Sequence, residues 1–250
     1  MNADRASTSP AYRRVLLKLS GEAFRNPDTG NSLDARVFAS MARQLRDVHE
    51  LGVELALVVG GGNIFRGMPG EGLGIDRTTG DHMGMLATVI NSLALQSALE
   101  QEGLSTRTMT AISMPAFAEP YIRRKAVRHL EKGRIVIFGA GTGNPFFTTD
   151  SAAALRASEI EADALLKATK VDGVYTADPE QDPEAVRYDD LSYREAISKQ
   201  LRIMDGAAFS LCMENRIPIV VFNFFKPDEI LRVVRGERNG TIVHEAKKGD

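Results

Sequence analysis

The stretch Gly139-Ala-Gly-Thr-Gly-Asn-Pro-Phe-Phe-Thr-Thr-Asp150 follows the apolar run 134–138 and precedes the alanine-rich segment 151–155. A buried strand, a glycine-rich turn and a helix start, in this order, place backbone N–H groups where they can bind an anion. Glycine lets the backbone approach the anion closely, the threonines add hydroxyl donors, and Asp150 adds a carboxylate that can hold a metal ion. The stretch therefore predicts a phosphate-binding turn between a strand and a helix.

A second turn of the same kind begins where the apolar run 55–59 leads into Gly60-Gly-Gly-Asn-Ile-Phe-Arg-Gly67. Two such turns in one chain predict two phosphorylated ligands, as a phosphotransferase with a phosphorylated acceptor requires. Common phosphate motifs explain neither turn. The chain has no G-x-x-x-x-G-K-[ST] motif, Phe65 stands where a dinucleotide-binding G-x-G-x-x-G needs its third glycine, and the protein-kinase motifs are missing.

The rest of the chain alternates between apolar runs and segments with helical spacing. Strands are expected at 15–19, 53–59, 106–112, 134–138, 164–168 and 219–222. Helices are expected between Asp34 and Gly52, at 81–102, 121–132, 151–160, 205–215 and 229–234, and after the capping box that starts at Ser192. Strands that alternate with helices predict an α/β fold, with one mostly parallel sheet between helices on both faces.

Several local features complete this prediction. We expect a disordered arm at 1–11 followed by a single domain at 12–250, and a long loop at 68–80. Asp81 is expected to be the N-cap of the helix that follows it. A tight hairpin turn is predicted at Asp172–Gly173 and an edge strand at 241–243. Cys212, the only cysteine, is expected to be a buried core residue of a helix.

The composition is that of a soluble globular protein, with 43% hydrophobic and 26% charged residues in a chain of 250. A formal net charge of −2 disfavours a nucleic-acid-binding protein. No apolar stretch approaches the ~18 residues of a membrane span, and the polar segment 1–10 has no secretory signal. These features predict a cytoplasmic protein that binds neither membranes nor nucleic acids.

In an open parallel sheet, ligands bind at the carboxyl ends of the strands. Lys18, Arg66, Lys167 and Lys170 stand at or just after predicted strand ends. Because phosphoryl transfer depends mainly on positioning and charge neutralisation, cations must converge on the transferred group. We expect Lys18, Arg66 and one other lysine to do so. The sequence leaves open whether that lysine is Lys167 or Lys170.

Six motifs of this chain together resemble the bacterial uridylate kinases, a family with the amino acid kinase fold. They are Lys18-Leu-Ser-Gly-Glu-Ala23, 60–67, 80–88, 139–150, 167–179 and Met204-Asp205, and the resemblance extends from about Arg14 to about Val243. It implies reversible transfer of the γ-phosphoryl group of ATP to UMP, giving UDP in pyrimidine nucleotide biosynthesis. Mg²⁺ would act with ATP and be held mainly by the nucleotide phosphates.

The resemblance also implies roles for individual residues. Catalysis would rest on Lys18, Asp150, Asp205 and Lys167, with Asp205 orienting the lysines. The residues expected at ATP are Lys18, Leu19, Ser20, Gly21, Gly62, Arg66, Thr169, Tyr175 and Asp178. Those expected at UMP are Gly61, Asp81, Thr142, Gly143, Asn144, Pro145, Phe146, Phe147, Thr148 and Thr149. An N-terminal lobe would bind UMP, and a C-terminal lobe at about 163–250 would bind ATP.

Assembly and regulation follow from the same resemblance, which implies a homohexamer and inhibition by UTP at the UMP site. Activation by GTP is expected to be weak or absent, because Gln96 and Glu100 stand where GTP-activated members carry basic residues. Two other functions stay open on this fold, since fold does not determine function. One is a non-catalytic nucleotide- or oxyanion-binding protein, and the other is a kinase for a small acid.

Overall fold

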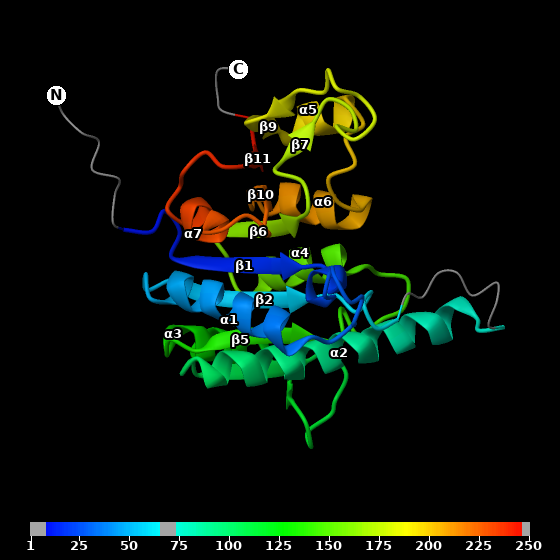
Figure 1. Ribbon diagram of the computed structural model, residues 1–250, viewed down its shortest axis with the longest axis vertical. Coiled ribbons are helices and arrows are strands. Elements are labelled where there is room, and N and C mark those ends of the chain that lie inside the picture. The colour runs from blue at the N-terminus through cyan, green and yellow to red at the C-terminus, as the bar shows by residue number, and fades with distance from the viewer. Residues whose placement is uncertain (1–8, 66–73, 247–250) are drawn as a thin grey trace.

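The computed structural model describes residues 9–65 and 74–246, which form a nine-stranded sheet and a two-stranded ribbon (Figure 1). The order in the sheet is β4-β3-β5-β2-β1-β6-β10-β11-β9, and the ribbon pairs β7 with β8. The strands are β1 (Arg14–Leu19), β2 (Glu54–Val59), β3 (Thr106–Thr110), β4 (Glu119–Pro120), β5 (Ile135–Gly139), β6 (Ala164–Thr169), β7 (Val174–Tyr175), β8 (Arg187–Tyr188), β9 (Asp190–Ser192), β10 (Ile219–Asn223) and β11 (Thr241–His244). Neighbouring strands of the sheet run parallel except β10 and β11, which confirms the predicted mostly parallel sheet.

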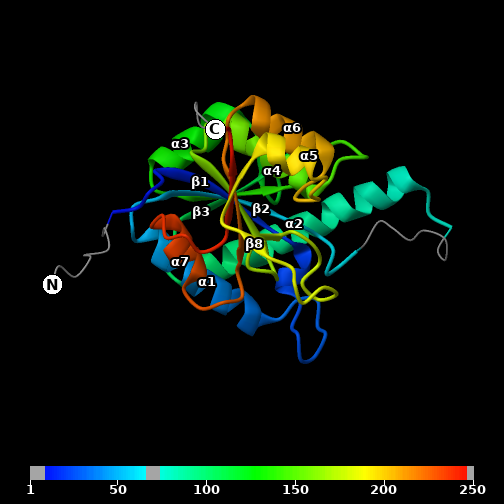
Figure 2. The same ribbon diagram turned by 90° about the horizontal axis from the view of Figure 1, so that it is seen from above.

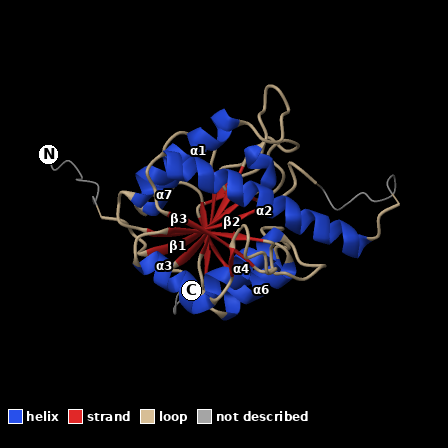
Figure 3. Ribbon diagram, turned by 90° about the horizontal axis from the view of Figure 1, so that it is seen from below, coloured by secondary structure: helices blue, strands red, loops and turns tan. Residues whose placement is uncertain are grey.

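Helices cover both faces of this sheet, as the α/β prediction requires. They are η1 (Gly21–Phe24, a 3-10 helix), α1 (Ala35–His49), α2 (Arg77–Gln101), α3 (Arg123–Glu131), α4 (Thr149–Glu159), α5 (Tyr193–Ser198), α6 (Gly206–Glu214) and α7 (Glu229–Val234). Figures 2 and 3 show α1, α2 and α7 on one face of the sheet and α3, α4 and α6 on the other. Apolar side chains form one core under each group of helices.

Helix α1 shows how the sequence specifies these elements. Its buried residues, which include Phe38, Met41 and Leu45, recur at helical spacing and face the sheet. The carboxylate of Asp34 accepts a hydrogen bond from the Arg36 N–H (2.9 Å) and caps the helix, as predicted. The predicted capping box that starts at Ser192 is also present and opens α5.

The start of α2 differs from the prediction. The helix begins at Arg77, because the carboxylate of Asp76 accepts the Thr79 N–H (3.1 Å) and caps it. Asp81 lies one turn inside the helix, so its prediction as N-cap is wrong. Residues 77–80, which were expected to belong to the loop 68–80, are therefore helical. Residues 66–73 lie outside the described residues. The N-terminal part of α2 extends beyond the rest of the fold (Figure 1).

The hairpin predicted at Asp172–Gly173 is wrong. The strand β7 pairs with β8 across the longer connection 176–186. The carboxylate of Asp172 instead accepts the hydroxyl of Tyr175, three residues further on (2.6 Å), and pairs with the distant Lys226 (3.0 Å). A tight Asp-Gly turn is a local signal, and these contacts override it.

The expected edge strand at 241–243 is an interior strand. Residues of β11 pair with β10 on one side and with β9 on the other, for example Val243 with Ile219 and with Leu191. The segment 190–192 thus forms the true edge. Three residues are too few to give a strand signal in the sequence.

Three further predictions can be compared with the structure, those for the N-terminal arm, for Cys212 and for membrane spans. Of the arm expected at 1–11, residues 1–8 lie outside the described residues, and the N–H of Ala11 donates to the carbonyl of Val234 (2.9 Å). Cys212 is fully buried in α6, as predicted, and burial raises the pKa of its thiol to about 12. No helix of the described segments is long and apolar enough to cross a membrane.

Candidate functional site

Lys18, Asp150 and Lys167 form a compact ionic cluster at the carboxyl ends of two central strands. Lys18 of β1 and Lys167 of β6 are partners in the parallel register. Because side chains alternate along a strand, both lysines share a face with Leu16 and Leu165, which pack in the core under α4. Asp150 lies in the first turn of α4 on that face. Its Oδ1 is 2.7 Å from Lys18 Nζ, and its Oδ2 is 2.8 Å from Lys167 Nζ.

The three side chains of this lysine–aspartate cluster are only 12–16% exposed, so their charges interact through a medium that screens poorly. Burial opposes ionisation of Asp150, but the ammonium groups of Lys18 and Lys167 outweigh it and hold its pKa below the ordinary 3.8. Burial lowers the pKa of Lys167, and the charge of Asp150 partly offsets this effect. With both lysines protonated, two positive charges and one negative charge leave the cluster able to attract an anion.

Asp205 stabilises the helix start that carries Asp150. As the N-cap of α6 it accepts the Ala208 N–H (2.9 Å), and it also accepts the hydroxyls of Ser151 (3.0 Å) and Thr148. Thr148 in turn caps α4, since its hydroxyl oxygen accepts the N–H groups of Asp150 and Ser151. Asp205 was expected to orient the lysines; among the described residues it forms no ion pair with them, but its charge acts to raise the pKa of Lys167 and it holds the helix start that carries Asp150. Lys167 instead donates to Asp150 and to the carbonyl of Ile203.

A cavity of about 270 Å³, here called the lysine cavity, opens at the cluster. Of the residues expected at ATP, Lys18, Ser20 and Thr169 line it, together with the catalytic candidate Lys167. Lys170 also lines it, and no described residue forms an ion pair with the Lys170 side chain. The side chain of Leu19 is fully buried, which leaves only its backbone available. Arg66 lies outside the described residues.

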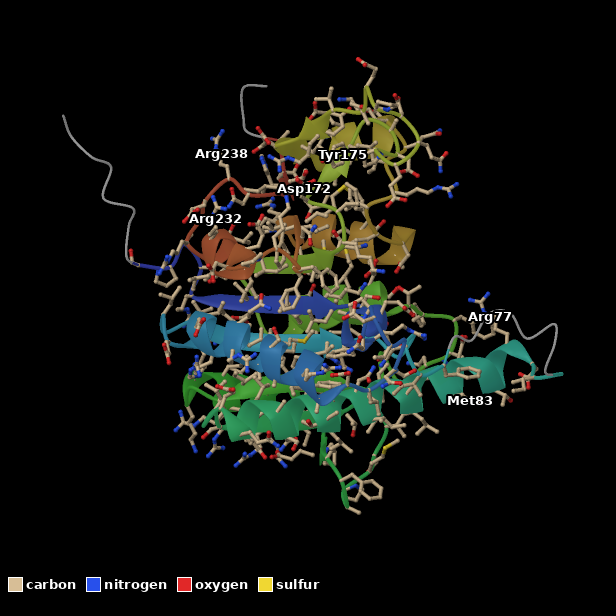
Figure 4. The ribbon with its side chains drawn as sticks, viewed as in Figure 1. Arg77, Met83, Asp172, Tyr175, Arg232 and Arg238 are labelled. Carbon is tan, nitrogen blue, oxygen red and sulfur yellow. The ribbon has the colours of Figure 1, made fainter. Side chains whose placement is uncertain are left out.

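Tyr175 and Asp178 do not line the lysine cavity. The Tyr175 hydroxyl donates to Asp172, and Figure 4 shows these two side chains close together on the ribbon segment. The carboxylate of Asp178 accepts the Glu180 N–H (3.0 Å) and the Gln181 amide (2.9 Å) in its own turn. Their expected role at ATP therefore stays a prediction, because the lining of this cavity does not include them.

A second cavity, of about 340 Å³, lies between the Gly60 turn, α2 and the loop 139–149. We call it the glycine cavity. The residues expected at UMP that line it are Gly61, Asp81, Thr142, Asn144, Phe147, Thr148 and Thr149, and Gly62 joins them. Gly143, Pro145 and Phe146 belong to the same loop but do not line the cavity. The lining is completed by residues that were not expected at UMP, which are Phe65, Gly141 and, from α2, Gly80, Gly84, Met85 and Thr88.

Asp81 connects α2 to the loop of the glycine cavity. Its Oδ2 accepts the N–H of Phe146 (2.8 Å), whose φ of +71° is in the left-handed region. Arg77, one turn earlier, lies 3.7 Å from the same carboxylate and 5.3 Å from the centre of the Phe146 ring. The loop conformation thus depends on Asp81, while the other carboxylate oxygen is not used in this contact.

The Gly60 turn touches the Ser20–Gly21 turn on one side and α2 on the other. A Cβ atom on Gly21 would lie 2.3 Å from the backbone nitrogen of Gly62. A Cβ atom on Gly61 would lie 2.8 Å from the Gly84 carbonyl oxygen of α2. Only glycine fits at these two positions. Because glycine has no side chain, the backbone segments approach closely, and ligands in the two cavities can lie close to each other.

A buried amide pair that sequence reasoning missed stabilises the Gly60 turn. Asn63 and Asn91 exchange two side-chain hydrogen bonds (2.7 and 3.1 Å) and are at most 2% exposed. The remaining amide N–H of Asn91 donates to the Gly60 carbonyl, and that of Asn63 donates to the Ser32 carbonyl. A buried polar network with every donor paired adds rigidity. The only sequence signal was an asparagine within the otherwise apolar middle of a helix.

Substitution of Asp150 tests the cluster through its effect on stability. In Asp150→Asn, two largely buried ammonium groups lose their carboxylate, which costs on the order of 3 kcal/mol of unfolding free energy at pH 7 by analogy with broken buried ion pairs. The folded-state pKa of Asp150 lies below 3.8, so this stabilisation is present above that pH and is lost as the pH falls through the folded pKa. Urea unfolding of both proteins, in steps downward from pH 7, measures the difference.

The matched control is Asp47→Asn. Asp47 pairs with Arg46 where both side chains are 35–45% exposed, so its loss should change the unfolding free energy by less than about 1 kcal/mol. A difference between Asp150→Asn and the unsubstituted protein that stays constant down to the lowest pH would contradict the depressed pKa.

Comparison with known proteins places this geometry in a family. The model of the amino acid kinase family matches residues 13–223. The solved structure of UMP kinase from Bacillus anthracis is 43% identical, with a TM-score of 0.91 over 94% of this chain and 97% of that chain. UMP kinase from Ureaplasma parvum is 37% identical (TM-score 0.89, 93% and 99% covered), and uridylate kinase from Archaeoglobus fulgidus is 30% identical (TM-score 0.71, 92% and 99% covered). The chain therefore belongs to the amino acid kinase family and, within it, to the UMP kinases.

Proposed function

We propose that this chain transfers the γ-phosphoryl group of ATP to UMP, giving ADP and UDP, in pyrimidine nucleotide biosynthesis. The observation that carries the proposal is the position of the lysine–aspartate cluster between two cavities. Lys18 and Lys167 line the lysine cavity, and Thr149, which lines the glycine cavity, directly precedes Asp150. ATP would bind in the first cavity and UMP in the second, so that the transferred group passes the cluster.

The chemistry requires little more than positioning and charge. A phosphate oxygen of UMP attacks the γ-phosphorus of ATP, the bond from that phosphorus to the bridging oxygen breaks, and ADP leaves with the electron pair. The attacking oxygen is already ionised near neutral pH, so no general base is needed. Lys18 and Lys167 would neutralise charge on the transferred group, and Asp150 would hold both ammonium groups in place.

Mg²⁺ is proposed to act with ATP. Among the described residues, no group of three or more His, Cys, Asp and Glu side chains could hold a metal ion, and both oxygens of Asp150 face lysines. These residues fit an ion held through the nucleotide phosphates, which is a common way for Mg²⁺ to bind. When bound, the ion neutralises phosphate charge.

The size of the glycine cavity bears on the rival functions. Its volume of about 340 Å³ falls within the range of roughly 300–1,000 Å³ that is common for pockets that bind nucleotide-sized ligands. A non-catalytic binding protein would not need two lysines on one buried carboxylate. Both observations favour a nucleotide kinase. We propose that it acts in the cytoplasm.

The substrate panel is the direct test of this function. UMP should be phosphorylated far better than CMP or dUMP, because Asp81 would accept a ribose hydroxyl and the loop 142–149 would contact the uracil. A site built to bond a hydroxyl rejects an analogue that lacks it. Release of ADP should be measured with ATP and each of UMP, CMP, dUMP, carbamate and acetylglutamate. Equal kcat/KM for UMP and dUMP would contradict the ribose contact, and preference for an acid would contradict the function.

Two substitutions separate chemistry from binding. Lys18→Met should lower kcat by on the order of 10²–10³, as loss of one preorganised electrostatic contact does, with little change in the KM for UMP. Asp81→Asn should act mainly on the KM for UMP, since the amide oxygen can still accept the Phe146 N–H. Steady-state kinetics with both substrates varied would show this split, and the reverse pattern would contradict both roles.

Self-association is proposed from the surface of α2. Leu86 and Ile90 lie one turn apart and are 49% and 46% exposed, an apolar face that another subunit can cover. Light scattering should give six times the mass of the chain. Leu86→Asp should produce smaller species, whereas Val186→Asp, at an apolar residue that is 64% exposed on the 176–186 connection, should leave the mass unchanged. A monomeric unsubstituted protein would contradict the hexamer.

Regulation by nucleotides is proposed to be inhibition by UTP without strong activation by GTP. The amide of Gln96 donates to Glu100 (2.9 Å), and Arg107, which lines a surface cavity with Gln96, pairs with Glu119 (3.5 Å). This surface therefore offers little uncompensated positive charge to a triphosphate. UTP should raise the KM for UMP, and GTP should change the rate by less than about twofold; several-fold activation would contradict this reading.

A further inference from the structure

An exposed aromatic side chain, Phe225, lines the lysine cavity. It is 53% exposed, although leaving a phenyl ring in water forfeits the free energy that its burial would give. A larger cavity of about 680 Å³ lies beyond it, and both cavities have Lys170, Phe224 and Phe225 in their linings. Phe225 therefore stands at their common boundary.

The backbone of Phe225 is held in place by side chains and strands. The side-chain oxygen of Asn223, the last residue of β10, accepts the Phe225 N–H (2.9 Å). The amide of the same asparagine donates to the carbonyl of Lys170 (2.7 Å), and the Phe224 N–H donates to the carbonyl of Thr169 (3.2 Å). Phe225 is thereby tied to the end of β6, the strand that carries Lys167.

The ring of Phe225 packs against the buried ring of Phe224. Phe224 is only 3% exposed and meets Phe225 edge to face, with ring centres 6.3 Å apart. One ring is thus anchored in the core while the next is presented to the cavities. A rigid, half-exposed aromatic face suits stacking by a flat heterocycle, which such rings bind without hydrogen bonds.

We propose that Phe225 is the residue on which the adenine base of ATP stacks. This inference rests on the proposed function, which places the ATP phosphates at Lys18 and Lys167. Those lysines and Phe225 line one cavity, so a nucleotide with its phosphates at the cluster extends its base toward the ring. The ammonium of Lys170, which forms no ion pair with a described residue, lies on the same lining, where it can meet the phosphates between the two ends.

The position of Tyr175 strengthens the assignment. It lines neither of the two cavities, and its hydroxyl is engaged by Asp172 (Figure 4). Asp172 also pairs with Lys226, the residue after Phe225 (3.0 Å). Tyr175 and Asp172 therefore help to hold the segment that carries Phe225, and the exposed aromatic face at the lysine cavity belongs to Phe225.

A fluorescent variant tests the stacking directly. The chain contains no tryptophan, so Phe225→Trp introduces a single indole reporter. Titration with Mg-ADP or Mg-ATP should quench its emission with saturation, because adenine stacks on the indole, while UMP should leave it unchanged. The control is Phe117→Trp, at a residue that is 69% exposed beside a separate cavity, whose emission should respond to neither nucleotide. Equal emission of the Phe225→Trp variant with and without Mg-ADP would overturn the proposal.

Kinetics provide the second measurement. Phe225→Ala should raise the KM for ATP about tenfold, in line with the loss of one base stack, while kcat and the KM for UMP stay within about twofold. Phe225→Tyr should restore the KM for ATP, whereas Phe225→Leu should not. An unchanged KM for ATP in Phe225→Ala would overturn the proposal, as would equal rescue by leucine and tyrosine.

The two levels of inference fail separately. If the unsubstituted protein does not phosphorylate UMP but Mg-ADP quenches the Phe225→Trp variant, the acceptor assignment fails and the stacking role stands. If UMP is phosphorylated and neither quenching nor a change in the KM for ATP is seen, the function stands and the role of Phe225 is refuted.

Discussion

The contact on which the site depends is the carboxylate of Asp150 between the ammonium groups of Lys18 and Lys167. Like charges on neighbouring strands repel each other, and their burial adds a desolvation cost. A carboxylate at the start of α4 offsets both effects and fixes the distance between the lysines. The register of β1 and β6 at the sheet centre brings the two lysines together, and the start of α4 beside their carboxyl ends supplies the carboxylate.

The remaining features bring two ligands to this cluster. Phosphoryl transfer is fast when donor and acceptor are held close and in line, and that requires backbone segments that approach each other without side chains. The contact of Gly21 with Gly62 meets this need, and the Asn63–Asn91 pair keeps the Gly60 turn against α2. Asp205 and Thr148 likewise hold the first turn of α4, which carries Asp150. These polar residues act by positioning the backbone around the site.

The sequence predicted elements whose signals are local. Strand and helix alternation gave the parallel sheet, Asp34 starts α1, and the helix expected at 205–215 is present as α6. The errors arose where the sequence offers several possible contacts and the fold uses one of them. The carboxylate of Asp76, and not that of Asp81, caps α2, and Asp172 binds Tyr175 and the distant Lys226 instead of forming a tight turn.

In the site, too, the sequence identified candidate residues but not their contact partners. The lysines were recognisable at strand ends, but only the register shows that Lys18 and Lys167 meet one carboxylate while Lys170 stays unpaired among the described residues. Periodicity gives the face of a side chain and not its partner. The Asn63–Asn91 pair joins residues far apart in the chain, and the exposure of Phe225 depends on how β10 ends, so neither could be derived from spacing.

The central claim is that Asp150 holds two lysines in position for transfer. Its most direct test is the single-turnover rate of ³²P transfer from ATP to UMP in Asp150→Asn, at saturating concentrations of both nucleotides and at a temperature where the variant is folded. The account predicts a rate lowered by on the order of 10²–10³ with nearly unchanged dissociation constants for ATP and UMP. A transfer rate equal to that of the unsubstituted protein would contradict it.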